Sequence, residues 1–506
     1  MKNTGNDLIH FGILDIFFAE RLLKNGYTKE RAHFLSALMH ASREGHLCQQ
    51  DANPPDLPPS IVEEGKDLFP KAPIVRHGDR YYLQRNWVLE THLLREMERL
   101  KGTPQPLILH GWEEAPLLPM QKKAVESALQ NRFSIICGGP GTGKTYTAAV
   151  LVRLLMAEKP QYKIILAAPT GKAASHLQSV LGRRLEATTL HRLLRITPGK
   201  NRLFTYRKID ADLIIVDEAS MIDIPLLAQL LESIGDETRL VLMGDPDQLP
   251  PVEAGSLFAE MAELFGTRLQ KSMRIEESAL HRLAEQVKEG APIDLSHHLN
   301  WPFDGSLVEK LYDEIDPLIS SDELDPSRCL KTLDRFRVLG ALRQGPFGID
   351  ELNRRIIHEM GRRIRPTQWW MVPVMITSNQ PEQDLYNGMC GVLIGKSRGG
   401  LNLREGTAFF PDSLKVPFNK LPPFETAFCL SIHKSQGSEF ERVLALFPQG
   451  SEHFGREAFY TAVTRAKKEV RVVADESLLK AILLKRSMKQ SGFIFRWHEM
   501  GGRNIM

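Results

Sequence analysis

The residues from Gly138 to Thr145, GGPGTGKT, carry the clearest chemistry in the sequence. They fit the pattern G-x-x-x-x-G-K-[ST], whose glycines let the backbone approach phosphate oxygens that a Cβ atom would obstruct. The backbone amides and the start of the following helix would supply positive charge for a triphosphate. A strand-to-helix turn without a ligand is the ordinary alternative, and Lys144, Thr145 and the flanking runs argue against it. The predicted nucleotide loop consists of Gly138, Gly139, Pro140, Gly141, Thr142, Gly143, Lys144 and Thr145.

Two carboxylates follow a second apolar run at 213–216, which is typical of a buried strand. Lys144 is expected to reach the β- and γ-phosphates, while Thr145 and Asp217 are expected to hold Mg²⁺. Glu218 could polarise the attacking water. Adjacent acidic residues near such a loop favour hydrolysis of the nucleotide over transfer of its phosphoryl group to another substrate. Gln248, after the run 240–243, could sense the γ-phosphate and the water.

The composition is that of an ordinary globular protein of several domains, with 506 residues, 42% hydrophobic and 25% charged. A net charge of +3 is not itself a sign of nucleic-acid binding, so any DNA contact would have to be local. Five cysteines without a C-x-x-C pair argue against a disulfide framework or a zinc site and suit a reducing cytosol. No apolar run approaches the length of a membrane span, and the first residues lack a signal sequence. We expect a cytoplasmic protein without membrane association.

The elements that must position these residues begin at about position 107, where strand-like runs alternate with helical ones. This alternation predicts a parallel α/β sheet, whose ligands bind at the carboxyl ends of its strands. The expected strands of this first lobe lie at 133–137, 163–168, 213–216 and 240–243. A second set at 336–342, 372–377, 427–432, 442–446 and 469–474 predicts a second α/β lobe. Residues 389–423 are rich in glycine, proline and β-prone residues and predict an inserted β module, while 1–105 predict a small helical accessory domain with one short strand at 79–83.

Four further strings resemble the conserved motifs II, III, V and VI of superfamily 1 helicases, in the order of that family. They are DEAS at 217–220, GDPDQLPPV at 244–252, HKSQGSEF at 433–440 and YTAVTRAK at 460–467. The strings TTLHRLL (188–194), VEAGSLF (252–258), EGHLC (44–48) and GDRYYLQRNW (78–87) resemble the RecD family, the alpha subunits of exodeoxyribonuclease V (RecBCD). The resemblance therefore spans nearly the whole chain and is weaker at 1–105 and 290–335.

The resemblance implies two RecA-like P-loop lobes, at 106–267 and at 268–388 with 424–506. It also implies an N-terminal docking domain at 1–105, an SH3-like β module at 389–423 and a short hairpin insert at about 195–208. In the family, that hairpin is a pin that splits the duplex, and residues 194–207 here contain a turn and four basic residues.

The resemblance also assigns roles at the nucleotide. Gln121 matches the glutamine that recognises adenine, and Gly437 and Glu439 match a segment near the sugar and phosphates. Arg274 and Arg465 match arginines of the second lobe that act as arginine fingers on the γ-phosphate. An arginine on a helix is otherwise usually a solvated charge, an alternative that stays open for Arg274.

Single-stranded DNA would be held by small hydroxyl, amide and loop-backbone groups, which suit contact with phosphate and sugar rather than with bases. For His191 a buried structural histidine is an equal alternative. The residues that the resemblance assigns to DNA are Pro169, Thr170, Thr189, His191, Asn379, Asn387, His433, Ser435 and Gln436.

The function implied is an ATP-dependent, 5′ to 3′ DNA helicase that acts on single strands and duplex ends. It would be the motor subunit of a helicase–nuclease for double-strand break repair and recombination, assembled with RecB-like and RecC-like subunits. A free-standing RecD-like helicase is an alternative, although those relatives carry a longer N-terminal region than the roughly 105 residues here. A second alternative is a subunit with a mainly regulatory role. The presence of Lys144, Glu218 and Arg465 argues against it. A non-motor P-loop enzyme would have no use for 433–440 and 460–467, and no second carboxylate cluster supports a nuclease site in this chain.

Overall fold

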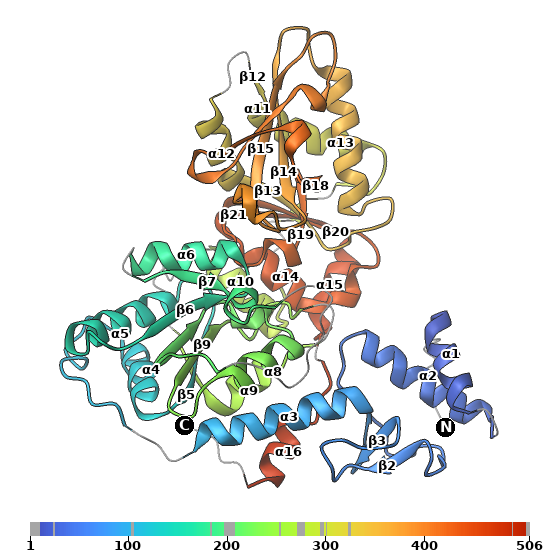
Figure 1. Cartoon of the computed structure of the whole chain (residues 1–506). Helices are drawn as coiled ribbons and strands as arrows, with labels where there is room; N and C mark the ends of the chain where they lie inside the picture. The colour runs from blue at the N-terminus through green and yellow to red at the C-terminus, as the bar shows by residue number, and fades with distance from the viewer. Residues whose placement is uncertain are drawn as a thin grey trace.

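The computed structural model places two parallel sheets one above the other, with the N-terminal region beside the lower one (Figure 1). Among the described residues no helix is long and apolar enough to cross a membrane. The structure describes residues 11–23, 26–102, 106–182, 185–196, 208–251, 255–270, 279–293, 298–299, 301–321, 325–487 and 489–501.

The first sheet is parallel throughout, with strand order β10-β5-β9-β8-β6-β7. Its strands are β5 (Phe133–Cys137), β6 (Ile164–Ala168), β7 (Ala187–Thr189), β8 (Leu213–Val216), β9 (Arg239–Gly244) and β10 (Gly266–Arg268). The four strands predicted here are confirmed, because their unbroken apolar runs are buried on both faces.

Helices cover both faces of this sheet. On one face lie α4 (Pro119–Gln130), α5 (Lys144–Glu158) and α6 (Gly171–Leu181), and on the other α3 (Gln84–Lys101), α8 (Ile224–Ser233) and α9 (Phe258–Phe265). Successive strand residues serve opposite faces, as Ile135 and Ile136 do when they enter two different cores. The carboxyl ends of the strands are left uncovered by these helices and carry the polar turns.

The second parallel sheet has the order β11-β21-β20-β13-β19. Its strands are β11 (His298–Leu299), β13 (Phe336–Gly340), β19 (Cys429–Ser431), β20 (Phe440–Phe447) and β21 (Ala466–Ala474). One face packs against α10 (Ala279–Glu289), α14 (Gly455–Thr464) and α15 (Glu476–Leu484). The other face shares a core with α11 (Ser306–Ile319), α12 (Pro326–Arg335) and α13 (Ile349–Arg363).

One predicted strand of this sheet belongs elsewhere. The run 372–377 lies in β14 (Trp369–Ile376), which pairs antiparallel with β15 (Cys390–Lys396) and β18 (Phe424–Thr426). β14 is apolar and almost entirely buried, and such a run looks the same whether its neighbours are parallel or antiparallel. The antiparallel sheet continues through β16 (Thr407–Phe409) and β17 (Lys415–Pro417), with β12 (Ser320–Ser321) at its other edge.

The N-terminal region contains more strand than the sequence predicted. Besides α1 (Ile13–Leu22) and α2 (Lys29–Arg43) it has a four-stranded sheet in the order β1-β4-β3-β2. These strands are β1 (Cys48–Gln50), β2 (Val62–Glu64), β3 (Ile74–His77) and β4 (Arg80–Leu83), of which only β4 was predicted. The others escaped prediction because runs of three or four residues are too short to show an alternating pattern.

The end of the chain returns from the second lobe to the first. After α15 the chain descends to α16 (Phe493–Glu499), which lies against α3 and α9 (Figure 1). Phe493 and Trp497 are fully buried there, and Trp497 packs edge-on against Phe265. The N-terminal region, the first sheet and the last helix therefore share one apolar core.

Candidate active site

The predicted nucleotide loop connects β5 to α5 at the carboxyl edge of the first sheet. Gly141 and Gly143 have φ values of 76° and 85°, which favour glycine. A Cβ atom on Gly138 would lie 2.6 Å from the carbonyl oxygen of Leu269, so only glycine fits there without displacing backbone. The Nζ of Lys144 donates to the carbonyl oxygens of Gly138 (2.7 Å) and Gly139 (3.1 Å). The ammonium group is thereby held inside the curve of the loop.

Thr145 and Asp217 meet at the same edge. The Thr145 hydroxyl donates to Oδ2 of Asp217 over 3.3 Å, and Asp217 is buried at the tip of β8. Burial raises the pKa of Asp217, an effect that the nearby Lys144 opposes. A hydroxyl and a carboxylate side by side fit Mg²⁺, which takes oxygen ligands and usually keeps waters and substrate phosphates as its others. Accordingly, the described residues contain no group of three or more His, Cys, Asp or Glu that could enclose a metal ion.

Glu218 has a strained backbone. Its φ of 53° is unusual for a residue other than glycine, and its amide donates to Oδ1 of Asp217 over 2.9 Å. Such strain is concentrated at functional sites, where the surrounding structure maintains it. Burial raises the pKa of Glu218, as does the charge of Asp217, while Arg465 lowers it. A carboxylate with a raised pKa is suited to accept a proton near neutral pH.

The loop after β9 presents Gln248 toward the same edge. Its Nε2 donates to Oδ2 of Asp245 over 3.1 Å, and its Oε1 is buried without a hydrogen-bond partner among the described residues. The amide of Asp247 donates to the other oxygen of Asp245 over 3.1 Å. Gln248 is therefore fixed at one end of its amide and has a free acceptor at the other.

The second lobe reaches this loop through α14 and the segment before β20. The backbone amide of Leu249 donates to the Thr461 hydroxyl over 2.8 Å, and Leu249 accepts from Nε2 of Gln436 over 2.5 Å. The hydroxyl of Tyr460 donates to Oδ2 of Asp245 over 3.0 Å. Neither Asp245 nor Tyr460 was predicted as a site residue, although both lie in the strings that carry the family resemblance.

Arg465 follows α14 and is 3% exposed. Its Nη1 donates to the carbonyl oxygen of Ser438 over 3.1 Å, while Nε has no partner among the described residues. The charge of this second-lobe guanidinium lowers the pKa of Glu218 on the first lobe. Arg274, its predicted companion, lies outside the described residues, as do residues 197–207 of the hairpin predicted at about 195–208.

Of the other predicted nucleotide residues, Gln121 contacts the loop, while Gly437 and Glu439 lie in the segment before β20. Gln121 is buried, accepts from the amide of Leu118 (3.0 Å) and donates to the carbonyl oxygen of Thr142 (3.1 Å), so it supports the loop directly. A Cβ atom on Gly437 would lie 3.8 Å from Oγ1 of Thr170, which places the segment before β20 against the start of α6. Glu439 lies 3.5 Å from Nζ of Lys467.

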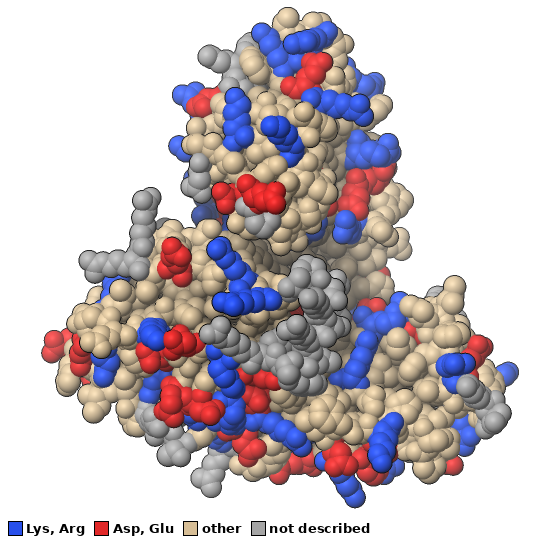
Figure 2. All heavy atoms as spheres, viewed as in Figure 1, with Lys and Arg blue, Asp and Glu red and all other residues tan. Residues whose placement is uncertain are grey.

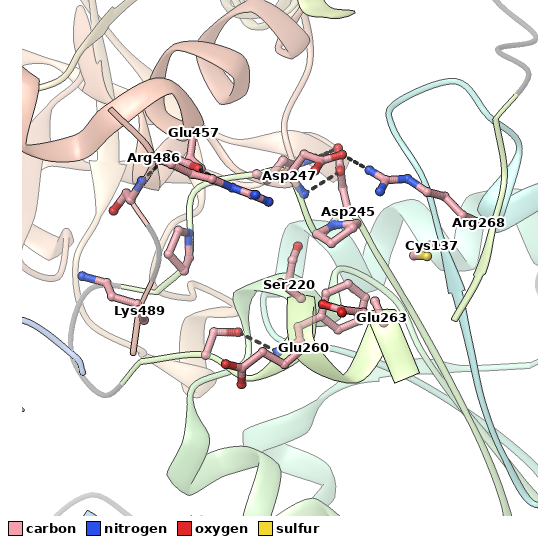
Figure 3. Close-up of a pocket in the computed structure, with 18 residues that line it drawn as sticks. Cys137, Ser220, Asp245, Asp247, Glu260, Glu263, Arg268, Glu457, Arg486 and Lys489 are labelled. Atoms are coloured by element: carbon pink, nitrogen blue, oxygen red, sulfur yellow. Dashed lines mark hydrogen bonds and ion pairs between the residues drawn. The ribbon is translucent and has the colours of Figure 1, made fainter. Parts of the chain in front are cut away.

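A cavity of about 440 Å³ opens beside this group rather than at it. Figure 3 shows Asp247 paired with Arg268 on one side of the cavity and Arg486 and Lys489 on the other. Its walls include Asp245 and Gln248 but none of Lys144, Thr145, Asp217 and Glu218. The site is therefore identified by the geometry of its side chains and not by the size of the cavity.

Several predicted DNA residues of the first lobe serve as helix caps. Thr170 accepts from the amide of Ala173 (3.2 Å) at the start of α6. Thr189 accepts from the amide of Arg192 (3.3 Å) at the start of α7 (Leu190–Leu193). Pro169 is half-buried, and His191 is exposed, so the alternative of a buried structural histidine does not hold.

The residues of the second lobe that were predicted to contact DNA divide into two groups. Asn379 and Asn387 are exposed and joined, since the amide of Asn387 donates to Oδ1 of Asn379 over 2.8 Å. Burial lowers the pKa of the half-buried His433 to about 4, so this imidazole is neutral at physiological pH. Ser435 and Gln436 are buried, with side chains bonded to Ile432 and Leu249. Ser435 therefore shapes the loop and Gln436 joins the lobes, while the contact of these two residues with DNA stays a prediction.

Charge does not mark a DNA face by itself. Figure 2 shows basic and acidic side chains mixed over the first lobe and the N-terminal region, with more basic than acidic groups on the second lobe. The near-neutral total of +3 agrees with this mixture.

The comparisons with known proteins agree with this geometry. An AAA domain matches residues 121–254, and a UvrD-like helicase C-terminal domain matches residues 426–473. The RecBCD enzyme subunit RecD of Mycolicibacterium smegmatis is 36% identical over 86% of this chain and 85% of its own length. The ATP-dependent RecD2 DNA helicase of Deinococcus radiodurans is 30% identical over 69% of this chain and 47% of its own length.

A solved structure of a Pif1 helicase from Bacteroides covers 76% of this chain and 97% of its own, at 16% identity and a TM-score of 0.45. The chain belongs to the RecD family and is an ATP-hydrolysing helicase of that family.

Proposed function

We propose that this chain unwinds DNA with the energy of ATP hydrolysis, moving 5′ to 3′ along a single strand from duplex ends. It acts as the motor subunit of a RecBCD-type helicase–nuclease in double-strand break repair and recombination, beside RecB-like and RecC-like subunits. The observation that carries the proposal is the contact between the lobes beside the nucleotide loop, where the Tyr460 hydroxyl of the second lobe donates to Oδ2 of Asp245 on the first over 3.0 Å. A site divided in this way couples hydrolysis to relative movement of the two lobes.

Each residue of the site has a distinct part in this proposal. Lys144 leaves the carbonyl oxygens of the loop for the β- and γ-phosphates, where its charge is better neutralised. Thr145 and Asp217 hold Mg²⁺, which when bound would neutralise developing phosphate charge. Glu218 accepts a proton from the attacking water, and the free Oε1 of Gln248 orients that water.

The remaining nucleotide residues complete the site from its edges. Gln121 recognises adenine beside the loop that it supports. Arg465 and Arg274 stabilise charge on the γ-phosphate as arginine fingers. Gly437 and Glu439 lie near the sugar and phosphates.

DNA binding is proposed for exposed loops at the junction of the two lobes. Pro169, Thr170, Thr189 and His191 contact the strand from the first lobe. Asn379, Asn387 and His433 do so from the second, where Ser435 and Gln436 set the shape of the loop. Because Gly437 lies against Thr170, a change of nucleotide that moves the lobes also moves the two sets of DNA contacts.

We also propose a division into domains. Residues 1–105 form a docking domain, 106–267 the first RecA-like lobe, and 268–388 with 424–506 the second. Residues 389–423 form an SH3-like module, for which the antiparallel strands β15 to β17 give support. The short insert at about 195–208 acts as the strand-separating pin.

The test uses the full chain purified with its native associates. With the other motor of the complex inactivated, Lys144→Ala should remove most DNA-stimulated ATPase and all unwinding by this motor while leaving DNA binding intact, because only the phosphate contact is lost. Lys163→Ala is the matched control, since Lys163 is exposed on the same lobe and pairs with Asp210. Duplexes with a 5′ tail should be unwound and those with a 3′ tail should not, once the other motor of the complex is inactivated. Unwinding by the Lys144→Ala chain, or a preference for 3′ tails, would contradict the proposal.

A further inference from the structure

Tyr460 occupies the point where three functional segments meet. It lies in α14 of the second lobe and is 3% exposed, and its hydroxyl donates to Oδ2 of Asp245 on the first lobe over 3.0 Å. A Cβ atom on Gly139 would lie 3.0 Å from the same hydroxyl, so this group also rests against the nucleotide loop. One hydroxyl of the second lobe thus contacts both the nucleotide loop and the turn after β9.

Asp245 links Tyr460 to Gln248 through hydrogen bonds. Oδ2 of Asp245 accepts from both the Tyr460 hydroxyl and Nε2 of Gln248. A carboxylate only accepts hydrogen bonds, so the amide nitrogen of Gln248 must face Asp245 and the amide oxygen must point away. That oxygen is buried without a partner among the described residues, as expected for an acceptor kept for a water or ligand.

We propose that Tyr460 is a positioning residue for ATP hydrolysis, whose hydroxyl fixes the Asp245 carboxylate and thereby the side-chain amide of Gln248. This inference rests on the proposed function. It adds a residue of the second lobe, distinct from Arg465, through which closure of the lobes aligns the side chain that orients the attacking water.

The inter-lobe contact does not depend on this hydroxyl alone. Thr461 and Gln436 bond to the backbone of Leu249, so these hydrogen bonds between the lobes remain when the Tyr460 hydroxyl is removed. Tyr460→Phe keeps the ring and removes one oxygen atom. The variant should therefore fold and keep the lobes together, while Asp245 and Gln248 lose their fixed orientation.

The experiment measures DNA-stimulated ATPase of the full chain with its native associates, with the other motor of the complex inactivated so that the measured rate belongs to this chain. Tyr460→Phe should lower kcat roughly 10-fold or more, the size typical when a hydrogen-bond partner of a functional side chain is removed. KM for ATP should change less than about twofold, because the phosphate contacts remain. In Gln248→Ala the amide is absent, so adding Tyr460→Phe to that variant should cause no further loss.

Tyr82→Phe is the matched control. Tyr82 is also a buried tyrosine whose hydroxyl donates to a buried carboxylate, Glu90, over 3.2 Å, but in the N-terminal region. Its kcat should equal that of the wild type. If Tyr460→Phe does not fold, Asp245→Asn supplies the same test. In the wild type both carboxylate oxygens of Asp245 accept hydrogen bonds, and an asparagine has only one acceptor oxygen.

The outcomes separate the inference from the function on which it rests. A wild-type chain without DNA-stimulated ATPase would contradict both the inference on Tyr460 and the proposed function. If the wild type is active and Lys144→Ala is not, a Tyr460→Phe chain within twofold of wild-type kcat would overturn this inference alone. So would losses from Tyr460→Phe and Gln248→Ala that multiply in the double variant, or a folded Asp245→Asn chain with wild-type kcat.

Discussion

Arg496 and Glu90 form a buried ion pair that joins the last helix of the chain to the N-terminal region. Nη1 of Arg496 lies 2.9 Å from Oε1 of Glu90, and their side chains are 7% and 0% exposed. Glu90 also accepts from Tyr82 and from the amide of Gly492, and the guanidinium lies over the ring of Trp87 at 3.7 Å. A contact between residues 406 positions apart therefore ties α16 to α3 after the chain has passed through both lobes.

Replacement of Arg496 by methionine should destabilise the protein strongly. The change leaves the Glu90 charge buried without its partner, for which the usual cost is about 3–5 kcal/mol. Urea unfolding and hydrogen exchange of the α3 and α16 amides would measure the loss. The control is Lys480→Ala, which removes an exposed ion pair with Glu476 and should cost less than about 0.5 kcal/mol. Equal effects of the two changes would show that the buried pair has no special role.

Glu260 should make the stability of the chain fall as the pH rises. Burial raises the pKa of this carboxyl from 4.5 to about 8, despite a hydrogen bond from Ser491. Between these values the folded chain keeps a proton that the unfolded chain releases, so ionisation favours unfolding. Glu260→Gln should remove this slope and gain on the order of 1–3 kcal/mol over the wild type between pH 5 and pH 8.

Denaturant midpoints at several pH values would test this prediction. Glu237→Gln, at an exposed position away from this helix, is the control. It should not reproduce the gain. A constant difference between Glu260→Gln and the wild type across the range would contradict the assignment.

The sequence predicted those parts of the structure that depend on short continuous stretches of residues. The strands β5 and β8 were predicted because each is one apolar run that ends directly at a polar motif, and parallel strands bring such ends to one edge. The proximity of Thr145 and Asp217 followed from that rule. The placement of β14 did not, because Trp369–Ile376 is buried in an antiparallel sheet but reads like a parallel strand.

Individual hydrogen bonds between the two lobes were beyond sequence reasoning. The bond between Asp245 and Tyr460 joins residues 215 positions apart, and no periodic pattern encodes such a pair. The same holds for the bond from Gln436 to the backbone of Leu249. The motifs identified which segments matter, while only the packing of the lobes shows which side chains remain free.

Glu218→Gln should abolish ATP hydrolysis without preventing nucleotide binding. Glutamine keeps the shape and cannot take the proton of the attacking water, so kcat should fall roughly 10²–10⁴-fold. Equilibrium binding of a fluorescent ATP analogue should stay within a few-fold of the wild type. Glu237→Gln, at an exposed position of the same lobe, should be neutral.

In the wild type, the rate of ATP hydrolysis should rise with pH as Glu218 ionises, with a midpoint above the ordinary value of 4.5 because the pKa of Glu218 is raised.

His191→Ala should weaken the binding of single-stranded DNA and leave nucleotide binding unchanged. The side chain is exposed at the start of α7, next to the carboxyl edge of the first sheet, and is free to reach a backbone phosphate. Loss of one hydrogen bond costs about 0.5–1.5 kcal/mol, which corresponds to a roughly 2- to 10-fold weaker Kd. Fluorescence anisotropy with an oligonucleotide at fixed salt would measure the change. The control is His110→Ala, because His110 is exposed on the same lobe but pairs with Glu158. If both variants bind DNA equally well, His191 does not contact the strand.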